Sequence, residues 1–158
     1  MIAINEDLIS KVTEKSKISE RKRQNFCFHY GNEDLIQRMI NVLQSDSYIR
    51  PHKHVFPLKR EIFIVLKGRF LYFEFNDSCE IITVFELNQA IGNYGVEIEP
   101  GVFHTLVAIE NDSVVYEIKD GPYNPVTDKI FASESPNETD DNVAEYLQNL
   151  KNFYFNKK

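Results

Sequence analysis

Residues 48–68 decide the fold of this 158-residue chain; they read Tyr48-Ile-Arg-Pro-His-Lys-His-Val-Phe-Pro-Leu-Lys-Arg-Glu-Ile-Phe-Ile-Val-Leu-Lys-Gly68. Two runs rich in β-branched and aromatic residues flank the six-residue loop 55–60, which is typical of two strands joined by a hairpin. His52 and His54 are two residues apart, so on a strand both imidazoles point to the same face. The hairpin brings Glu61, the first residue of the second run, beside the histidine pair.

The same pattern of short apolar runs separated by turn residues extends to residue 119. The predicted strands are 48–54, 61–66, 69–75, 80–86, 96–98, 103–110 and 113–119. Seven short strands with no helix between them predict an antiparallel sandwich or barrel and exclude a βαβ fold.

The two flanks of this β-region have a different pattern. Asn5 is a good helix N-cap in front of an apolar stripe, and a second short helix is expected after Asn32, where residues 35–43 carry apolar side chains at helical spacing. Residues 120–125 predict an extended arm. The polar, acidic stretch 133–142 predicts a linker, and residues 143–155 predict an amphipathic helix that docks on its own domain, with a dimer contact or a partner-binding helix as alternatives.

The expected organisation is therefore an N-terminal helical segment (1–46), a β-barrel (47–132), and an acidic linker with a C-terminal helix (133–158). The length fits one domain. A net charge of −6 argues against nucleic-acid binding, and no apolar run approaches the length of a membrane span. Two cysteines cannot form a disulfide framework, and the N-terminus lacks the pattern of a signal peptide, so a cytoplasmic protein is expected.

A third histidine completes a candidate metal site. His104 opens a predicted strand after the turn at Pro100-Gly101. Three neutral imidazoles (His52, His54, His104) and the Glu61 carboxylate suit one divalent cation, and Fe, Mn, Ni and Zn all accept this set. Four protein ligands on an octahedral ion leave two positions for water or substrate. The alternative is that these histidines have no shared role.

Five further residues are candidates for substrate binding or proton transfer. Arg50 can bind an anionic substrate group, or form a surface salt bridge. Lys59 is expected at the rim of the barrel mouth, where it can contact substrate. Glu117 and Lys119 share a face of the last strand, where a buried Glu can act as a general base or form a structural ion pair. Tyr123 can close over the cavity, or simply pack.

The spacing of the metal-ligand candidates resembles the two motifs of the cupin superfamily. The first motif is His-x-His, a spacer, Glu, six residues and Gly, which here are His52, His54, Glu61 and Gly68; Pro100, Gly101 and His104 match the end of the second. The chain departs from the pattern in its six-residue spacer, in its adjacent Pro and Gly, and in having Ala108 where an Asn is often found.

A closer resemblance, over residues 5 to 138, is to the WbuC-type cupin-fold metalloproteins, in which the long spacer is normal. The stretches that carry it are Arg23-Gln-Asn-Phe-Cys-Phe-His29, Ile36-Gln-Arg38, Tyr48-Ile-Arg-Pro-His-Lys-His54, Pro57-Leu-Lys-Arg-Glu61, Val96-Glu-Ile98, Pro100-Gly-Val-Phe-His-Thr105, Lys119-Asp-Gly-Pro-Tyr123 and Asp128-Lys-Ile-Phe131. The resemblance implies a mainly β cupin double-stranded β-helix, a jelly-roll barrel holding a metal, and an association with bacterial surface-polysaccharide synthesis. It implies no particular reaction.

Two classes of function follow from these features. The first is a metalloenzyme acting on a small polar molecule such as a sugar or sugar nucleotide, with isomerase-, epimerase- or lyase-like chemistry, or an Fe(II) dioxygenase. The second is a non-catalytic, metal-dependent binding protein for a small ligand. Exposed edge strands of jelly-roll barrels often pair between subunits, so a homodimer is also expected.

Overall fold

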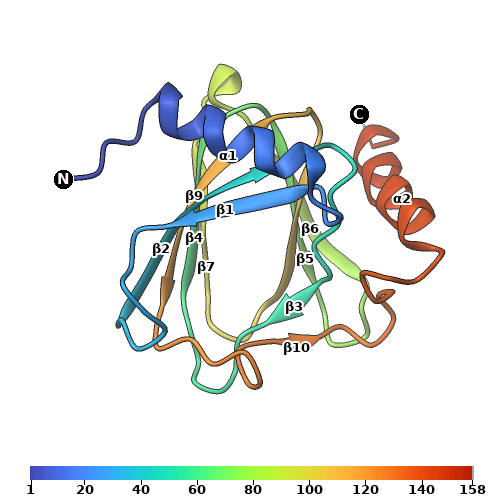
Figure 1. Ribbon diagram of the computed structural model, residues 1–158. Coiled ribbons are helices and arrows are strands. Elements are labelled where there is room, and N and C mark those ends of the chain that lie inside the picture. The colour runs from blue at the N-terminus through green and yellow to red at the C-terminus, as the bar shows by residue number, and fades with distance from the viewer. Residues whose placement is uncertain (158) are drawn as a thin grey trace.

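Two five-stranded antiparallel sheets form the body of the molecule, as the computed structural model shows for residues 1–157 (Figure 1). The first sheet has the order β1-β2-β9-β4-β7 and the second the order β10-β3-β8-β5-β6. The strands are β1 (Arg23–Cys27), β2 (Ile36–Leu43), β3 (His52–Lys53), β4 (Glu61–Lys67), β5 (Phe70–Phe75), β6 (Ile81–Leu87), β7 (Gly95–Ile98), β8 (Phe103–Ala108), β9 (Ser113–Asp120) and β10 (Ile130–Phe131). The helices are α1 (Glu6–Ile18), the short 3-10 helix η1 (Gln89–Ile91) and α2 (Val143–Phe155). The expected mainly β jelly-roll with a helix at each end is confirmed.

The two sheets pack face to face, and a helix covers the outer face of each. Between the sheets lies an apolar core that includes Phe63, Tyr72 and Leu106. On the outside, α1 packs on the first sheet and α2 packs on the second, where Leu147 and Leu150 are buried (Figure 1). Phe63 and Leu106 of this core also line a cavity inside the barrel.

The capping and docking predicted for the terminal helices are confirmed. The Asn5 side chain accepts a hydrogen bond from the backbone N–H of Leu8 at the start of α1. The helix α2 spans the predicted residues and packs on its own domain. No helix within residues 1–157 combines the length and the apolar character needed to cross a membrane.

The predicted second helix is wrong, because residues 36–43 form strand β2. Ile40 and Val42 pack under α1, whereas Gln37, Met39 and Asn41 face a cavity inside the barrel. This alternation has the period of a strand. The apolar residues in this stretch also fit helical spacing, and pairing with β1 and β9 decides in favour of the strand.

The predicted barrel strands agree with the structure except at the edges. The run 48–54 contains only the short strand β3, and the segments that form β1 and β10 were not among the predicted strands. The other six predicted strands correspond to β4 to β9. The pairing of β3 with both β8 and β10 places His52 opposite His104 and opposite Phe131, which brings two ligand candidates together.

Candidate metal centre

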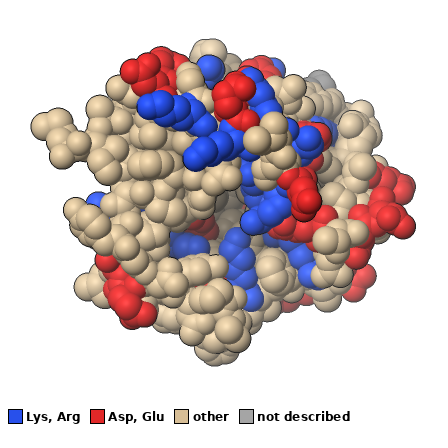
Figure 2. Space-filling view, viewed as in Figure 1, with Lys and Arg blue, Asp and Glu red and all other residues tan. Residues whose placement is uncertain are grey.

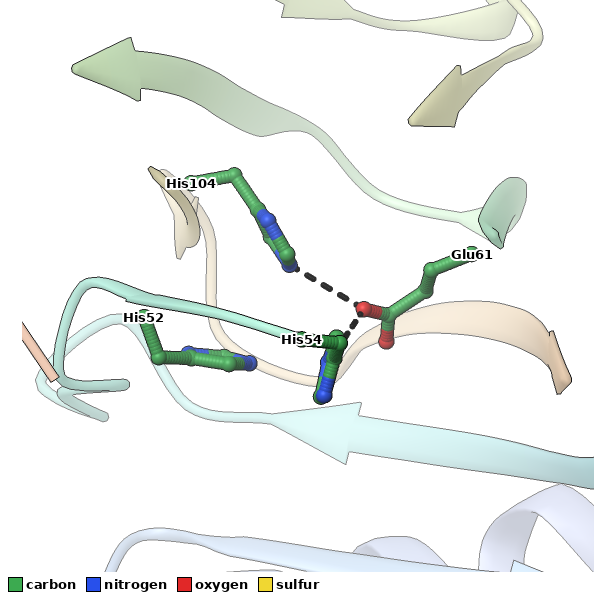
Figure 3. A group of neighbouring side chains, drawn as sticks. All are labelled: His52, His54, Glu61 and His104. Atoms are coloured by element: carbon green, nitrogen blue, oxygen red, sulfur yellow. Dashed lines mark hydrogen bonds and ion pairs between the residues drawn. The ribbon is translucent and has the colours of Figure 1, made fainter. Parts of the chain in front are cut away.

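The four predicted ligand residues meet inside the barrel. His52 comes from β3, His54 follows this strand, and Glu61 and His104 lie at or next to the starts of β4 and β8 (Figure 3). One donor atom from each side chain lies within 4.8 Å of the donor atoms of the other three. All four residues are at most 4% exposed. A buried group of this composition could hold a metal ion.

Backbone carbonyls fix the orientation of all three imidazoles. The Nδ1 atoms of His52 and His104 donate to the carbonyls of Arg50 at 2.8 Å and Val102 at 2.9 Å, and Nδ1 of His54 donates to the carbonyl of Asp128 at 2.5 Å. Because a carbonyl can only accept, each Nδ1 carries the proton and each Nε2 is free to be a ligand.

The Nε2 atoms and one carboxylate oxygen converge. Oε2 of Glu61 lies 3.0 Å from Nε2 of His104 and 3.2 Å from Nε2 of His54 (Figure 3). Lone pairs on neutral Nε2 atoms would repel a carboxylate at these distances, so the group needs a cation at its centre, either protons or a metal ion. Two ligands at ~2.1 Å from one ion and at right angles to each other are ~3.0 Å apart, which fits the observed separations.

Burial and hydrogen bonding set the charges of the group. Burial holds the pKa of His52 well below its usual value, so this imidazole is neutral at neutral pH. Burial alone would raise the pKa of Glu61, but the contacts of its carboxylate with His104 and His54 outweigh this effect and hold the pKa well below its usual value. An ionised carboxylate among imidazoles is suited to binding a divalent cation.

A buried ion cluster supports this group from behind. The Asp128 carboxylate accepts hydrogen bonds from Nζ of Lys59 at 2.5 Å and from Nζ of Lys119 at 3.0 Å. The expected rim position of Lys59 is wrong, because Lys59 is 2% exposed and also donates to the carbonyl of Pro122. Lys59 therefore lies behind the histidine group and anchors the segment that carries Asp128.

A cavity of about 470 Å³ opens in front of the histidine group. Its lining includes His52 and Glu61 together with Glu117, Lys119 and Tyr123. The volume lies within the range of small-molecule sites. The three predicted catalytic candidates and two of the four metal-ligand candidates thus line one cavity.

The chemical states of the two candidate acid–base groups differ. Burial, followed by the charge of Glu61, raises the pKa of Glu117 to about 8, and Nδ2 of Asn41 donates to its carboxyl group at 2.6 Å. Burial lowers the pKa of Lys119, but the carboxylates of Glu61, Glu117 and Asp128 outweigh it and the net pKa is raised. Near neutral pH, Glu117 can hold a proton, whereas Lys119 stays charged. The ammonium of Lys119 lies 5.6 Å from the ring centre of Tyr123.

Comparison with known proteins identifies the family of the chain. A family model described as a domain of unknown function (DUF6016) matches residues 4–87, more than half of the chain. The chain belongs to this family. The matched region of this DUF6016 protein contains His52, His54 and Glu61, and no curated protein matches the chain.

Solved structures show the fold of this DUF6016 protein. A double-stranded β-helix protein from Klebsiella pneumoniae aligns with a TM-score of 0.56 at 12% identity, covering 80% of this chain and 95% of that one. L-ribose isomerase from Cellulomonas parahominis gives 0.56 at 11% identity, with 71% and 70% covered. The capsular polysaccharide assembling protein CapF from Staphylococcus aureus gives 0.55 at 20% identity, and the match covers 72% of this chain but only 30% of CapF. These likenesses confirm the cupin, or double-stranded β-helix, fold.

The remaining predicted residue, Arg50, lies beside the histidine group rather than in the main cavity. Its guanidinium donates to Ser135, Asn137 and the carbonyl of Ala132, and it lies over the ring of Phe131. It lines a second, neighbouring cavity of about 250 Å³.

Sequence reasoning missed three polar residues at the centre, Asn41, Asp128 and Lys129. Asn41 lay in the predicted helix, and the other two lay in Asp128-Lys-Ile-Phe131, a stretch that carried the family resemblance but was given no role in the site. The signal that could have found Asp128 and Lys129 is a charged pair directly in front of the apolar Ile130-Phe131.

Proposed function

We propose that the protein binds one divalent metal ion through His52, His54, Glu61 and His104 and uses it to act on a small polar molecule such as a sugar or sugar nucleotide. The observation that carries this proposal is the convergence of three Nε2 atoms and one carboxylate oxygen beside a polar cavity. When bound, the metal would supply Lewis-acid chemistry, polarising a carbonyl or stabilising an enediolate. This chemistry is that of an isomerase, epimerase or lyase.

The residues that line the cavities are proposed to have different roles in proton transfer and ligand binding. Glu117 holds a proton near neutral pH and can give or take one at its carboxyl oxygen, with Asn41 fixing its orientation. Lys119 stays charged and donates hydrogen bonds, and Tyr123 forms part of the wall between the two cavities. Arg50 is proposed to contact the outer end of the ligand, because it lines the outer cavity.

The biological setting is proposed on resemblance. The WbuC-type resemblance of the sequence implies bacterial surface-polysaccharide synthesis, and CapF, which shares the fold, is described as a capsular polysaccharide assembling protein. A homodimer and a cytoplasmic location stay predictions.

The test of the metal site is the metal content of purified protein, measured by inductively coupled plasma mass spectrometry. The wild-type protein is expected to carry about one ion per chain, and His52→Ala and His104→Ala are expected to lower this content strongly. His29→Ala is the matched control, because His29 is the fourth histidine of the chain and hydrogen-bonds with the backbone of Arg38 instead. Equal metal content in all four proteins would refute the site.

A turnover screen then separates an enzyme from a binding protein. Metal-loaded protein is incubated with nucleotide-activated sugars, sugar phosphates and free sugars, and the products are followed by mass spectrometry and NMR. Turnover that is lost in both His52→Ala and Glu117→Gln supports the enzyme. Ligand binding without turnover of any compound would instead identify a metal-dependent binding protein.

A further inference from the structure

Lys129 lies where the two cavities meet. Its side chain lines both the cavity that contains His52 and the outer cavity. On β10, Phe131 is paired with His52, so strand alternation places Lys129 on the same side of the strand as His52. The Lys129 side chain therefore borders the interior of the barrel.

Lys129 also differs from the other lysines and arginines that line these cavities, since each of those has a partner within the protein. Lys119 donates to Asp128, Arg21 and Arg23 both donate to Glu138, and Arg50 donates to Ser135 and Asn137. Within residues 1–157, the Lys129 ammonium forms no hydrogen bond and no ion pair. Its three donors are available to a ligand.

Within residues 1–157, no acidic side chain of the cavities forms an ion pair with Lys129. Burial and the charge of Lys119 lower the pKa of Lys129, and the carboxylates of Glu61, Glu117 and Asp128 offset part of this effect. Glu138 is shared by two arginines, Asp128 is shared by two lysines, and Glu61 lies among the histidines. Glu117 accepts a hydrogen bond from Nδ2 of Asn41 at 2.6 Å. A positive charge is therefore left over in this hollow, although the whole chain carries a net charge of −6. Figure 2 shows this face hollowed near its centre, with basic side chains around and inside the hollow.

Glu138 shows that a carboxylate fits beside these basic groups. Its Oε2 accepts from Nε of Arg21 at 2.9 Å and its Oε1 accepts from Nη2 of Arg23 at 2.5 Å. Glu138 lines the outer cavity, on which Lys129 also borders. The Glu138 carboxylate thus pairs with the guanidinium groups of Arg21 and Arg23, whereas the Lys129 ammonium has no such partner within residues 1–157.

We propose that Lys129 binds an oxyanion group of the ligand whose other end lies at the histidine group. The ligand class is then an anionic small molecule, a phosphorylated, nucleotide-linked or carboxylated sugar, rather than a neutral sugar. This inference rests on the proposed function for the position of the ligand's other end, and names the substrate class of the same site.

The test compares matched probes on full-length, metal-loaded protein by isothermal titration calorimetry. The probes are glucose, glucose 6-phosphate, glucuronate and UDP-glucose, so that a neutral sugar is compared with a phosphoryl group, a carboxylate and a diphosphate. The variants are Lys129→Gln, Lys129→Arg, and Lys67→Gln as the control, because Lys67 is exposed at the end of β4 and lines neither cavity.

The wild-type protein is expected to bind at least one charged probe about tenfold or more tightly than glucose. Lys129→Gln is expected to remove about tenfold of that affinity, with Lys129→Arg and Lys67→Gln close to wild type. Higher salt should weaken binding of the charged probe in wild type more than in Lys129→Gln.

Three results would overturn the proposal: glucose binding as tightly as every charged probe, no binding of any charged probe up to about 10 mM, or an unchanged affinity in Lys129→Gln. Metal content measured on the same samples keeps this test separate from the proposed function. A wild-type protein without metal would refute the metal centre, whereas the comparison of Lys129→Gln with wild type would still test the oxyanion site.

Discussion

Replacing Asp128 by Asn should destabilise the protein by more than any surface charge change. The side chains of Asp128, Lys59 and Lys119 are 2%, 1% and 6% exposed, and both ammonium groups donate to the one carboxylate. An Asn side chain offers one acceptor oxygen, and its NH₂ group faces the second ammonium. The change leaves buried positive charge without compensation, for which a loss of about 3–4 kcal/mol is expected.

The magnitude can be measured against a matched surface pair. Asp120 pairs with Arg60, whose side chain is 63% exposed, so Asp120→Asn should cost only about 0.5–1 kcal/mol. Urea unfolding followed by far-UV circular dichroism, with EDTA present so that metal binding does not contribute, gives both values. With a slope of about 2 kcal/mol per M urea, Asp128→Asn should lower the midpoint by about 1.5–2 M.

A double-mutant cycle tests the cause. Removing the charge of Lys59 together with that of Asp128, in Lys59→Met/Asp128→Asn, should cost at least about 1 kcal/mol less than the sum of the two single changes. Additive costs, or an Asp128→Asn loss no larger than that of Asp120→Asn, would refute the interpretation of this cluster as a buried and coupled group.

Two further predictions concern the ends of the barrel strands. Hydrogen bonds from Arg69, and then from Asn88, lower the pKa of the buried Glu86 to about 2, so this stabilisation is fully present above about pH 4.5 and is lost as the pH falls toward 2. Between pH 5 and pH 2, Glu86→Gln should lose about 1–2 kcal/mol less unfolding free energy than wild type, after allowance for the partial exposure of Arg69. Equal slopes of thermal stability against pH in the two proteins would contradict this. Gly68 has a φ of +76°, and an added Cβ would lie 2.2 Å from Oγ of Ser113, so Gly68→Ala should cost about 2–3 kcal/mol. Gly92→Ala, with a φ of +82° and open space around it, should cost only about 1 kcal/mol by the same unfolding measurement, and equal costs would show that the contact with Ser113 is unimportant.

The strands that could be predicted from sequence are those whose apolar residues fit strand spacing but not helical spacing. In β4 to β9, β-branched and aromatic runs are separated by turn residues, and local preference agrees with the sheet. In β2, Ile36, Met39, Ile40 and Leu43 fit a helix as well as a strand. Pairing along the whole length of β9 settles this ambiguity, and that contact joins residues 70 to 84 positions apart, from Leu43–Ser113 to Ile36–Asp120. No local pattern carries this information.

The ligand set could be predicted, but its surroundings could not. Charged residues are usually exposed, so Lys59 in a loop was expected at the rim. It is buried because Asp128, 69 residues further along the chain, supplies a carboxylate beneath it. The same segment places Lys129 at the cavity, and although Asp128-Lys-Ile-Phe131 contributes to the family resemblance, this resemblance gave Lys129 no role.

The hydrogen bonds of the three histidines explain this difference. His52 and His104 each donate Nδ1–H to the carbonyl two residues earlier, so the local backbone of each motif sets the orientation of its imidazole. His54 instead donates to the carbonyl of Asp128, which is remote in sequence. The segment that holds this carbonyl also supplies the carboxylate for the two buried lysines and the free ammonium of Lys129. A short motif therefore specifies which atoms could bind the metal, whereas one distant segment orients the third imidazole and adds a lysine to the cavity, so the proposed ligand class depends on a residue outside the motif.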